Sequence, residues 1–164
     1  MKTVLVTGSN GFIGRNLIQN LSRKKAEYKI ITFRRDNSLK DLKSSLAQAD
    51  FVYHLAAVNR TKDEKDFERV NVGLTKQIVD ILIDMNRKVN IVMTSSVQAL
   101  EDNPYGKSKR AAEEILKDYS NKIKASVYIY RLPNVFGKWG RPNYNSVVST
   151  FCYNITHEKD IWIS

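Results

Sequence analysis

The sequence predicts an α/β protein built on a Rossmann-like, doubly wound parallel sheet. Two observations lead to this class: a glycine-rich turn follows an apolar run at the start of the chain, and apolar strand-like runs then alternate with helical patterns. The 164 residues can form one core, and the sequence contains no repeat, linker or low-complexity segment. We therefore expect about five parallel strands, with helices covering both faces of the sheet.

The first strand is expected at about residues 3–7 and leads into Thr7-Gly8-Ser9-Asn10-Gly11-Phe12-Ile13-Gly14. Three glycines at this spacing let the turn close, let a pyrophosphate approach bare backbone, and let the next helix, at about 12–24, pack against the strand. The N-terminus of that helix offers free N–H groups and a positive dipole end to phosphates. This pattern predicts a dinucleotide site, with an ordinary tight turn as the alternative.

The second strand, at about residues 28–33, ends next to Arg34 and Arg35. Arg34 stands about 20 positions after Gly14, where an acidic residue would bind the ribose 2′-hydroxyl of NAD and an arginine would accommodate the 2′-phosphate of NADP. A guanidinium pairs with a phosphate, whereas a carboxylate repels it. NADP(H) is therefore the predicted cofactor. The alternative is that both arginines are solvated surface charges, and the neighbouring Asp36 favours that alternative.

The later elements follow the same alternation. Only one helix, at about 38–48, fits between the second strand and the third, which predicts strand order 2-1-3-4-5 and a ligand crevice between the carboxyl ends of strands 1 and 3. We expect the remaining strands at about 50–55, 90–94 and 126–131, and the remaining helices at about 64–86 and 105–120.

The third strand ends in His54-Leu55-Ala56-Ala57, where small side chains would let a cofactor approach the backbone. His54 is either a catalytic group or, as for most histidines inside apolar strands, a structural residue whose ring is hydrogen-bonded. Asn71, in the helical segment at 64–86, either organises the site by bonding buried backbone or is a plain polar helix residue.

The fourth strand leads to Ser96, and Tyr105 and Lys109 follow on the next helix. Because the tyrosine and the lysine are four residues apart, they lie on one helical face. A nearby ammonium stabilises a phenolate, so we expect Lys109 to lower the pKa of Tyr105. Tyr105 would then exchange a proton with a carbonyl or hydroxyl oxygen that Ser96 also holds, while a hydride moves to or from a nicotinamide. These three residues are the predicted catalytic group.

Together these motifs make the chain similar to the extended short-chain dehydrogenase/reductase superfamily, also called the NAD-dependent epimerase/dehydratase family. The likeness consists of the Thr-Gly-x-x-Gly-x-x-Gly opening, the His-Leu-Ala-Ala strand end, the Ser-Ser turn, the Tyr-x-x-x-Lys pair and an Arg-x-x-Asn-Val-Phe-Gly segment at 131–137. Segments 102–106, 127–131 and 136–146 resemble more closely the CapF/WbjC-type nucleotide-sugar reductases of bacterial surface polysaccharide synthesis.

This resemblance implies NADPH-dependent reduction of the 4-keto group of a UDP-linked 2-acetamido-dideoxy-hexulose, on the route to UDP-N-acetyl-L-fucosamine of capsular polysaccharide. In that group a metal-binding cupin domain further along performs C3 epimerisation, so no metal site is expected here. Asn134, Lys138 and Arg141 would face the phosphates of the UDP-sugar, or else form a capped turn with surface charges. The expected cofactor contacts are Gly8, Asn10, Gly11, Phe12, Ile13, Gly14, Arg34, Arg35, Leu55, Ala56, Ala57, Tyr105, Lys109 and Pro133.

Family members continue for about twice this length, which predicts a chain that is truncated before its substrate lobe is complete. Residues 1–137 would form the NADP-binding Rossmann domain, and 138–164 the incomplete start of a substrate-binding region. The last five residues resemble the beginning of a strand. Apolar groups of this region that lack a partner favour self-association, so we expect a homo-oligomer.

Composition limits the other classes of function. The formal net charge of +10 is compatible with nucleic-acid binding, but the basic residues are scattered and are not interleaved with aromatic residues, which predicts no nucleic-acid partner. Neither a signal peptide nor an apolar run of about 20 residues is present, which predicts no membrane association. The single cysteine, Cys152, suits a reducing cytoplasm.

Two alternatives to a reductase remain: a nucleotide-sugar 4-epimerase or 4,6-dehydratase, and a cofactor-binding module without turnover. An epimerase usually has an acidic residue after strand 2, where this chain has Arg34. A dehydratase usually has Asp-Glu after strand 4, where this chain has Val97-Gln98. A pure binding module has no need to keep Ser96, Tyr105 and Lys109 together.

Overall fold

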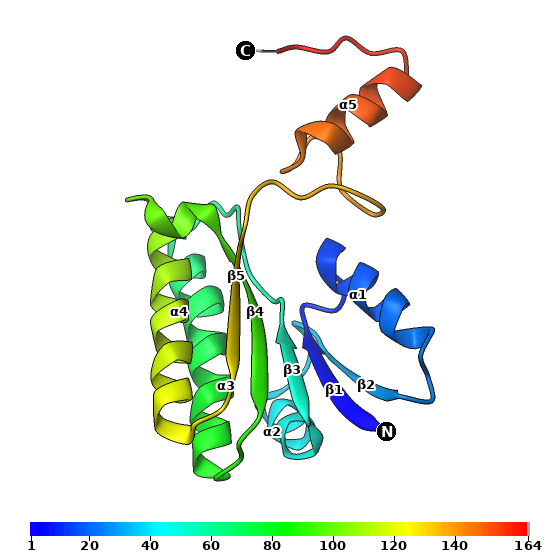
Figure 1. Ribbon diagram of the computed structural model, residues 1–164. Helices are drawn as coiled ribbons and strands as arrows, with labels where there is room; N and C mark the ends of the chain where they lie inside the picture. Colours follow the sequence, from blue (N-terminus) through cyan, green and yellow to red (C-terminus); the bar gives the residue numbers. More distant parts are fainter. Residues whose placement is uncertain (164) are drawn as a thin grey trace.

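The computed structural model describes residues 1–163 and contains one five-stranded sheet (Figure 1). Its strand order is β2-β1-β3-β4-β5, and every neighbouring pair is parallel, which confirms the predicted topology. The strands are Lys2–Thr7 (β1), Tyr28–Phe33 (β2), Phe51–His54 (β3), Asn90–Ser96 (β4) and Val127–Leu132 (β5).

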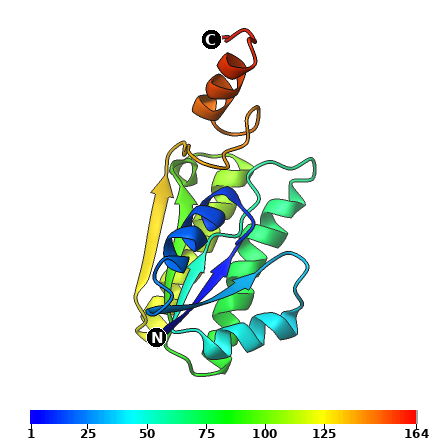
Figure 2. The ribbon, with the colours of Figure 1, turned by 90° about the vertical axis from the view of Figure 1, so that its right-hand side faces the viewer.

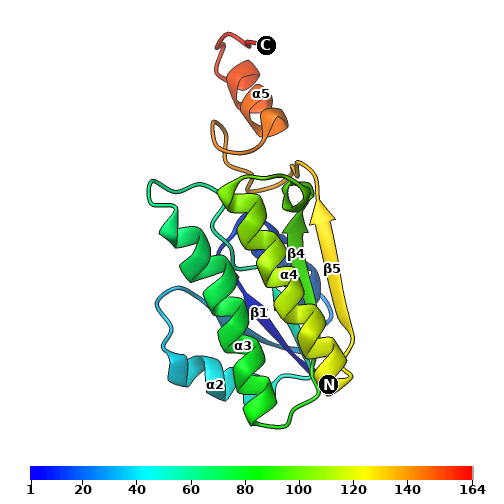
Figure 3. The same cartoon turned by 90° about the vertical axis from the view of Figure 1, so that its left-hand side faces the viewer.

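Helices cover the two faces of the sheet unequally. Helix α1 lies alone on one face (Figure 2), whereas α2, α3 and α4 lie side by side on the other (Figure 3). The chain winds from β1 to β2 in one direction and from β3 to β5 in the other, and right-handed crossovers therefore place the first helix opposite the rest. These helices are Phe12–Ser22 (α1), Leu39–Gln48 (α2), Gly73–Asp84 (α3) and Pro104–Ile123 (α4).

The apolar core lies between the sheet and the three-helix layer. Leu5, Val52 and Ile91 of the central strands are fully buried there. Tyr119 of α4 is also buried, and its hydroxyl accepts from the Val89 N–H (3.0 Å) and donates to the Val89 carbonyl (2.9 Å). The helix residues that complete this core include Leu42, Leu46, Ile78, Leu82 and Leu116.

Local signals explain where α4 begins. The Asn103 side chain accepts from the Gly106 N–H at 2.7 Å, and Pro104 occupies the first helical position, where its missing N–H costs no hydrogen bond. The helix therefore begins directly after the β4 region. Its first turn contains Tyr105, and its second contains Lys109.

The helix expected at 64–86 is divided in two. A π-helical segment, η1, spans Phe67–Val72, and α3 follows it directly. A short 3₁₀ turn, η2 (Val97–Leu100), separates β4 from α4. Neither feature was predicted, because the apolar spacing of both segments fits an ordinary helix or turn equally well.

After β5 the chain passes beyond the carboxyl edge of the sheet and forms α5 (Val147–Thr156), which stands away from the main body (Figure 1). This helix was not predicted, and none of its residues is buried. The expected strand at the C-terminal end is wrong as far as Ile163, since residues 157–163 contain no strand. A strand requires a neighbour to satisfy its backbone, and this segment runs clear of the sheet.

Within residues 1–163, no helix combines the length and the apolar character that crossing a bilayer requires.

Candidate functional site

The glycine-rich turn joins β1 to α1 directly against the end of β3. Gly8 has a φ of +67°, and a Cβ at this position would lie 2.6 Å from the backbone nitrogen of Ala56. The Gly11 N–H donates to the Gly8 carbonyl at 2.9 Å, and a Cβ on Gly14 would collide with that same carbonyl. The crevice between β1 and β3 is therefore lined by bare backbone on this side.

The first turn of α1 keeps its N–H groups available. In the described part of the chain no side chain caps the helix at Gly11, and its first turn contains no acidic residue. The N–H groups that begin at Phe12 and Ile13 therefore point out of the helix end together with its positive dipole. This arrangement fits the pyrophosphate of a dinucleotide.

The structure separates the two arginines that follow β2. Arg34 lines a pocket of about 310 Å³ together with Ser9, Asn10 and Thr32. Arg35 instead lies on the side of Asp66: hydrogen bonds from Thr61 and Arg69 hold the pKa of that carboxyl below its usual range, and the charge of Arg35 lowers it further. Only Arg34 thus faces the glycine-rich turn across a pocket.

His54, at the end of β3, is enclosed by two threonines. Its Nδ1 lies 2.8 Å from Thr7 Oγ1 and its Nε2 lies 2.9 Å from Thr75 Oγ1. Thr75 donates its own proton to the Asn71 carbonyl, so it must accept from the Nε2–H of a neutral ring. Burial and the nearby Lys109 charge lower the pKa of His54 to about 3. These contacts support the structural interpretation of His54.

Asn71 connects the loop after β3 to α4 from within the π-helical segment. Its Oδ1 accepts from the Val58 N–H at 2.8 Å, and its Nδ2 donates to the Val58 carbonyl at 3.0 Å and to Ser108 Oγ at 2.9 Å. The Ser108 hydroxyl in turn donates to the Tyr105 carbonyl at 2.7 Å. This chain of bonds supports the view that Asn71 organises the site.

Ser96 and Tyr105 meet where β4 passes into α4. The Tyr105 ring packs against Phe67, with 5.7 Å between ring centroids. Burial raises the pKa of Tyr105, and hydrogen bonding to Ser96 offsets part of that rise. The expectation that Lys109 lowers this pKa below its ordinary value is therefore wrong, because burial disfavours the phenolate and the opposing effect comes from Ser96.

Lys109 is almost completely buried, with 2% of its surface exposed. Its Nζ donates to the Thr94 carbonyl on β4 at 2.7 Å. Burial lowers its pKa from 10.5 to about 8, and the charge of Glu113 opposes that shift. At neutral pH the Lys109 side chain is therefore mostly protonated, and its positive charge is buried at the β4–α4 junction.

Glu113 is a further buried group that the sequence analysis missed. Arg131 of β5 pairs with its carboxylate, with 2.6 Å between Nη2 and Oε2, and Ser95 Oγ donates to its Oε1. Burial tends to raise the pKa of Glu113, but the hydrogen bonds from Arg131 and Ser95 prevail and lower it. The signal was present, since Tyr105, Lys109 and Glu113 recur at four-residue spacing on α4.

The predicted cofactor and substrate contacts after β5 lie on the surface. Pro133, Asn134 and Arg141 are exposed, as is Lys138. The Lys138 carbonyl accepts from Asn16 Nδ2 at 2.9 Å, which fixes this part of the chain against α1. The structure therefore brings Lys138 next to the first part of α1.

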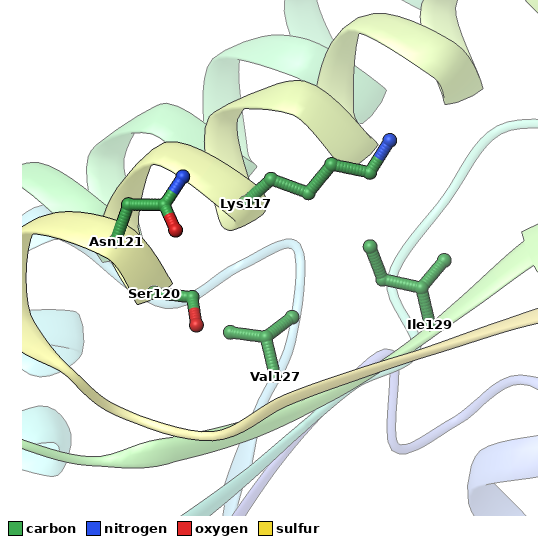
Figure 4. A pocket seen from close by; sticks show the side chains of 5 residues that line it. All are labelled: Lys117, Ser120, Asn121, Val127 and Ile129. Carbon is green, nitrogen blue, oxygen red and sulfur yellow. The ribbon is translucent and has the colours of Figure 1, made fainter.

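A second hollow, of about 320 Å³, lies between α4 and β5 (Figure 4). It is lined by Lys117, Ser120 and Asn121 of α4 and by Val127 and Ile129 of β5. These residues belong to the end of α4 and the first part of β5, away from the carboxyl ends of the strands. None of the predicted site residues contributes to it.

The family model described as "NAD dependent epimerase/dehydratase family" matches residues 4–163. The chain belongs to this family. The name of this family includes the cofactor NAD, which agrees with the glycine-rich turn and the uncapped α1 described above. A UDP-glucuronic acid 4-epimerase from Bacillus cereus, solved in complex with NAD, is similar in structure. At 22% identity and a TM-score of 0.82, that structure shares the fold.

Three relatives illustrate the range of this family. A UDP-2-acetamido-2,6-beta-L-arabino-hexul-4-ose reductase of Pseudomonas aeruginosa is 46% identical over 161 residues, which is 98% of this chain and 43% of that protein. The capsular polysaccharide assembling protein CapF of Staphylococcus aureus superposes with a TM-score of 0.83 at 42% identity, over 98% of this chain and 43% of that one. An undecaprenol-linked N-acetylglucosaminyl 4-epimerase of Escherichia coli O157:H7 is 33% identical over 85% of this chain and 51% of its own. The chain thus spans about half or less of these relatives.

Proposed function

We propose that this chain is the cofactor-binding and catalytic part of a reductase that uses NADPH to reduce the 4-keto group of a UDP-linked 2-acetamido-dideoxy-hexulose. The observation that carries the proposal is the grouping of Ser96, Tyr105 and Lys109 at the β4–α4 junction, on the same edge of the sheet as the glycine-rich turn. The 46% identity to a reductase named for such a sugar supports the choice of substrate. The similarity to CapF, a capsular polysaccharide assembling protein, supports a role in capsular polysaccharide synthesis. We propose a cytoplasmic location, which the single cysteine, Cys152, favours.

In this proposal Tyr105 is the proton donor. When bound, NADPH supplies the hydride for the carbonyl carbon. The Tyr105 hydroxyl donates its proton to the carbonyl oxygen, and Ser96 donates a hydrogen bond to the same oxygen, so the ketone becomes an alcohol. The tyrosinate that remains is reprotonated from solvent. Because burial raises the pKa of Tyr105, the group is protonated, as an acid must be, at neutral pH.

In this proposal Lys109 supplies a positive charge near Ser96 and Tyr105. Its ammonium is the positive charge that stabilises the tyrosinate formed after proton transfer. The bond to the Thr94 carbonyl holds the ammonium against the end of β4. Glu113 opposes deprotonation of the buried lysine, and Arg131 and Ser95 keep that glutamate ionised.

The proposed cofactor contacts begin at the glycine-rich turn, whose bare backbone fits a pyrophosphate. Gly8, Gly11 and Gly14 admit the pyrophosphate, the N–H groups at Phe12 and Ile13 bind it, and Leu55, Ala56 and Ala57 line the way to the nicotinamide. Arg34, which shares a pocket with Asn10, pairs with the 2′-phosphate in preference to Arg35. Pro133 is the last cofactor contact within the domain of residues 1–137. Asn134, Lys138 and Arg141 bind the phosphates of the UDP-sugar where the substrate-binding region begins.

The choice of NADPH is tested by calorimetry on the 164-residue chain. A charge-assisted contact with the 2′-phosphate is worth about 1.5–3 kcal/mol, so NADPH should bind at least about tenfold more tightly than NADH. Arg34→Ala should remove most of the difference, and Arg35→Ala should leave it in place. Equal affinities for the two cofactors would exclude this assignment.

The reaction is tested with the full-length gene product and UDP-linked 4-keto sugars. Net NADPH oxidation with formation of the 4-hydroxy sugar is the expected result. Conversion of a UDP-sugar to its 4-epimer without net oxidation of the cofactor would favour the epimerase alternative. Cofactor binding without any turnover would favour a binding module.

A further inference from the structure

The pocket beside Arg34 is lined on one side by a residue from a distant part of the chain. Its lining includes the glycine-rich turn, α1 and the end of β2, and one wall is the indole of Trp139, which is more than 100 positions away in the sequence from every other lining residue. The full lining is Ser9, Asn10, Arg15, Ile18, Gln19, Thr32, Arg34 and Trp139.

Several contacts hold Trp139 in this place. The Asn16 side chain donates to the Lys138 carbonyl at 2.9 Å, which ties the preceding residue to α1. The Arg15 guanidinium carbon lies 4.7 Å from the centre of the indole, and the Lys138 Nζ lies 4.6 Å from it. Trp139 also has a φ of +67°, which is uncommon for a bulky residue. The indole is thus held by contacts with α1 and with the preceding residue, Lys138.

The chemistry of this pocket suits an anion attached to a flat ring. Arg15 and Arg34 both line it, and within residues 1–163 neither guanidinium forms a salt bridge with a carboxylate. Guanidinium groups bind phosphate in a two-pronged geometry, and an indole offers a surface for stacking. The buried Ser9 Oγ also lines the pocket and has no hydrogen-bond partner among the described residues. A volume of about 310 Å³ is at the lower end of the range for small-ligand sites.

We propose that Arg15 and Trp139 are specificity-determining residues for the cofactor, forming with Arg34 a pocket for the 2′-phosphorylated ribose at its adenosine end. This inference rests on the proposed function and deepens it. Arg15 is the second cation on the 2′-phosphate. Trp139 holds the Arg15 guanidinium by stacking and closes the pocket on the solvent side. The competing view is that the Arg15–Trp139 contact only packs the segment after β5 against α1.

The test uses the fact that the chain has two tryptophans. In a Trp162→Phe background, Trp139 is the remaining tryptophan, and its emission is followed while adenosine 2′,5′-bisphosphate or adenosine 5′-monophosphate is added at constant ionic strength. We expect a saturable change with the bisphosphate at a concentration at least about tenfold lower than with the monophosphate.

Variants then separate the two views. Arg15→Ala should weaken bisphosphate binding about tenfold in calorimetry and leave monophosphate binding unchanged. Arg23→Ala, which removes an exposed arginine at the other end of α1, is the matched control and should change neither. Trp139→Leu should weaken bisphosphate binding even though Arg15 is retained.

The possible failures are distinguishable. One outcome is that the bisphosphate binds and Arg34→Ala weakens this binding, whereas neither Trp139 emission nor the affinity of Arg15→Ala changes. In that case the packing view is correct, and the NADPH assignment stands. If neither nucleotide binds, both the inference and the proposed cofactor function are wrong.

Discussion

Tyr105 and Lys109 show how burial determines the state of a proton at single residues. At the β4–α4 junction Lys109 is buried and Tyr105 partly buried, and desolvation disfavours the charged form of each. The tyrosine is therefore held as a neutral donor, whereas the lysine is brought closer to neutrality than an exposed lysine. Their spacing was visible in the sequence. The direction of the tyrosine shift was not, because it depends on contacts such as the one with Phe67, 38 positions away.

Removing the Tyr105 hydroxyl should abolish proton transfer without disturbing the cofactor site. In the full-length protein, Tyr105→Phe should lower the rate of ketone reduction by about 10²–10⁴-fold. NADPH affinity, measured by calorimetry on the same variant, should barely change, since the ring and its contact with Phe67 remain. Near-normal reduction by this variant would show that another group is the acid.

The buried charge of Lys109 should cost folding stability in a pH-dependent way. Its pKa is about 8 in the folded chain and about 10.5 when exposed, so the unfolded chain binds this proton more tightly. The penalty is therefore full below pH 8 and disappears as the pH rises toward 10.5. Lys109→Met should raise the free energy of unfolding in urea by about 1–3 kcal/mol at pH 7, and this gain should shrink by roughly 1 kcal/mol at pH 9.

The exposed Lys107, two positions earlier on the same helix, provides the control. Lys107→Met should change stability little at either pH, since exposed ion pairs contribute little. A gain in Lys109→Met that did not depend on pH would mean that packing, and not charge, is responsible.

At the scale of elements, the β1–α1 turn depends on its glycines for shape. Gly8→Ala would place a methyl group against Ala56 at a backbone angle that only glycine adopts easily. We expect the free energy of unfolding to fall by roughly 2–5 kcal/mol, and NADPH binding to be lost, because the turn can no longer lie against β3. Thermal unfolding and calorimetry measure the two effects.

Gly73 is the matched control for this substitution. It has helical angles of φ −61° and ψ −45°, and a Cβ there would meet nothing closer than 3.6 Å. Gly73→Ala should therefore stabilise the chain by about 0.4–1 kcal/mol and leave cofactor binding unchanged. If both alanine variants behaved alike, the special role of the turn would be refuted.

The regular elements were predictable from local patterns, and the irregular ones were not. Strand order followed from the glycine-rich turn and from the short span between β2 and β3. In the π-helical segment ending at Val72, Asn71 bonds both Val58, in the loop after β3, and Ser108 of α4. Likewise, the position of Trp139 depends on α1, far away in the sequence. Contacts of this kind leave no local period in the sequence.

At the scale of the whole molecule, the chain consists of a packed body and a C-terminal segment that extends from it (Figure 1). The segment after residue 146 exposes large apolar side chains, with Ile155 64% and Trp162 86% exposed. Apolar surface of this kind favours association between copies. The apolar core of the body, by contrast, is formed by the sheet and α2–α4, without any residue of α5.

Deleting residues 147–164 should therefore separate assembly from stability. We expect the intact chain to sediment as a dimer or larger species and the shortened chain to sediment as a monomer. The free energy of unfolding of the body should stay within about 0.5 kcal/mol, because α5 buries none of its residues. An intact chain that sediments as a monomer would contradict the predicted homo-oligomer.

The course of the chain after Leu132 has an evolutionary consequence. Because β5 runs parallel to its neighbours, whatever follows it emerges at the edge of the sheet where the glycine-rich turn and Tyr105 also lie. Mutations, insertions or recombination in that later region can thus alter which molecule is recognised while leaving the proton-transfer residues and their supporting bonds intact. Proteins that share this scaffold can therefore change the molecule that they bind through mutations in one contiguous part of the gene, the part that encodes the residues after β5.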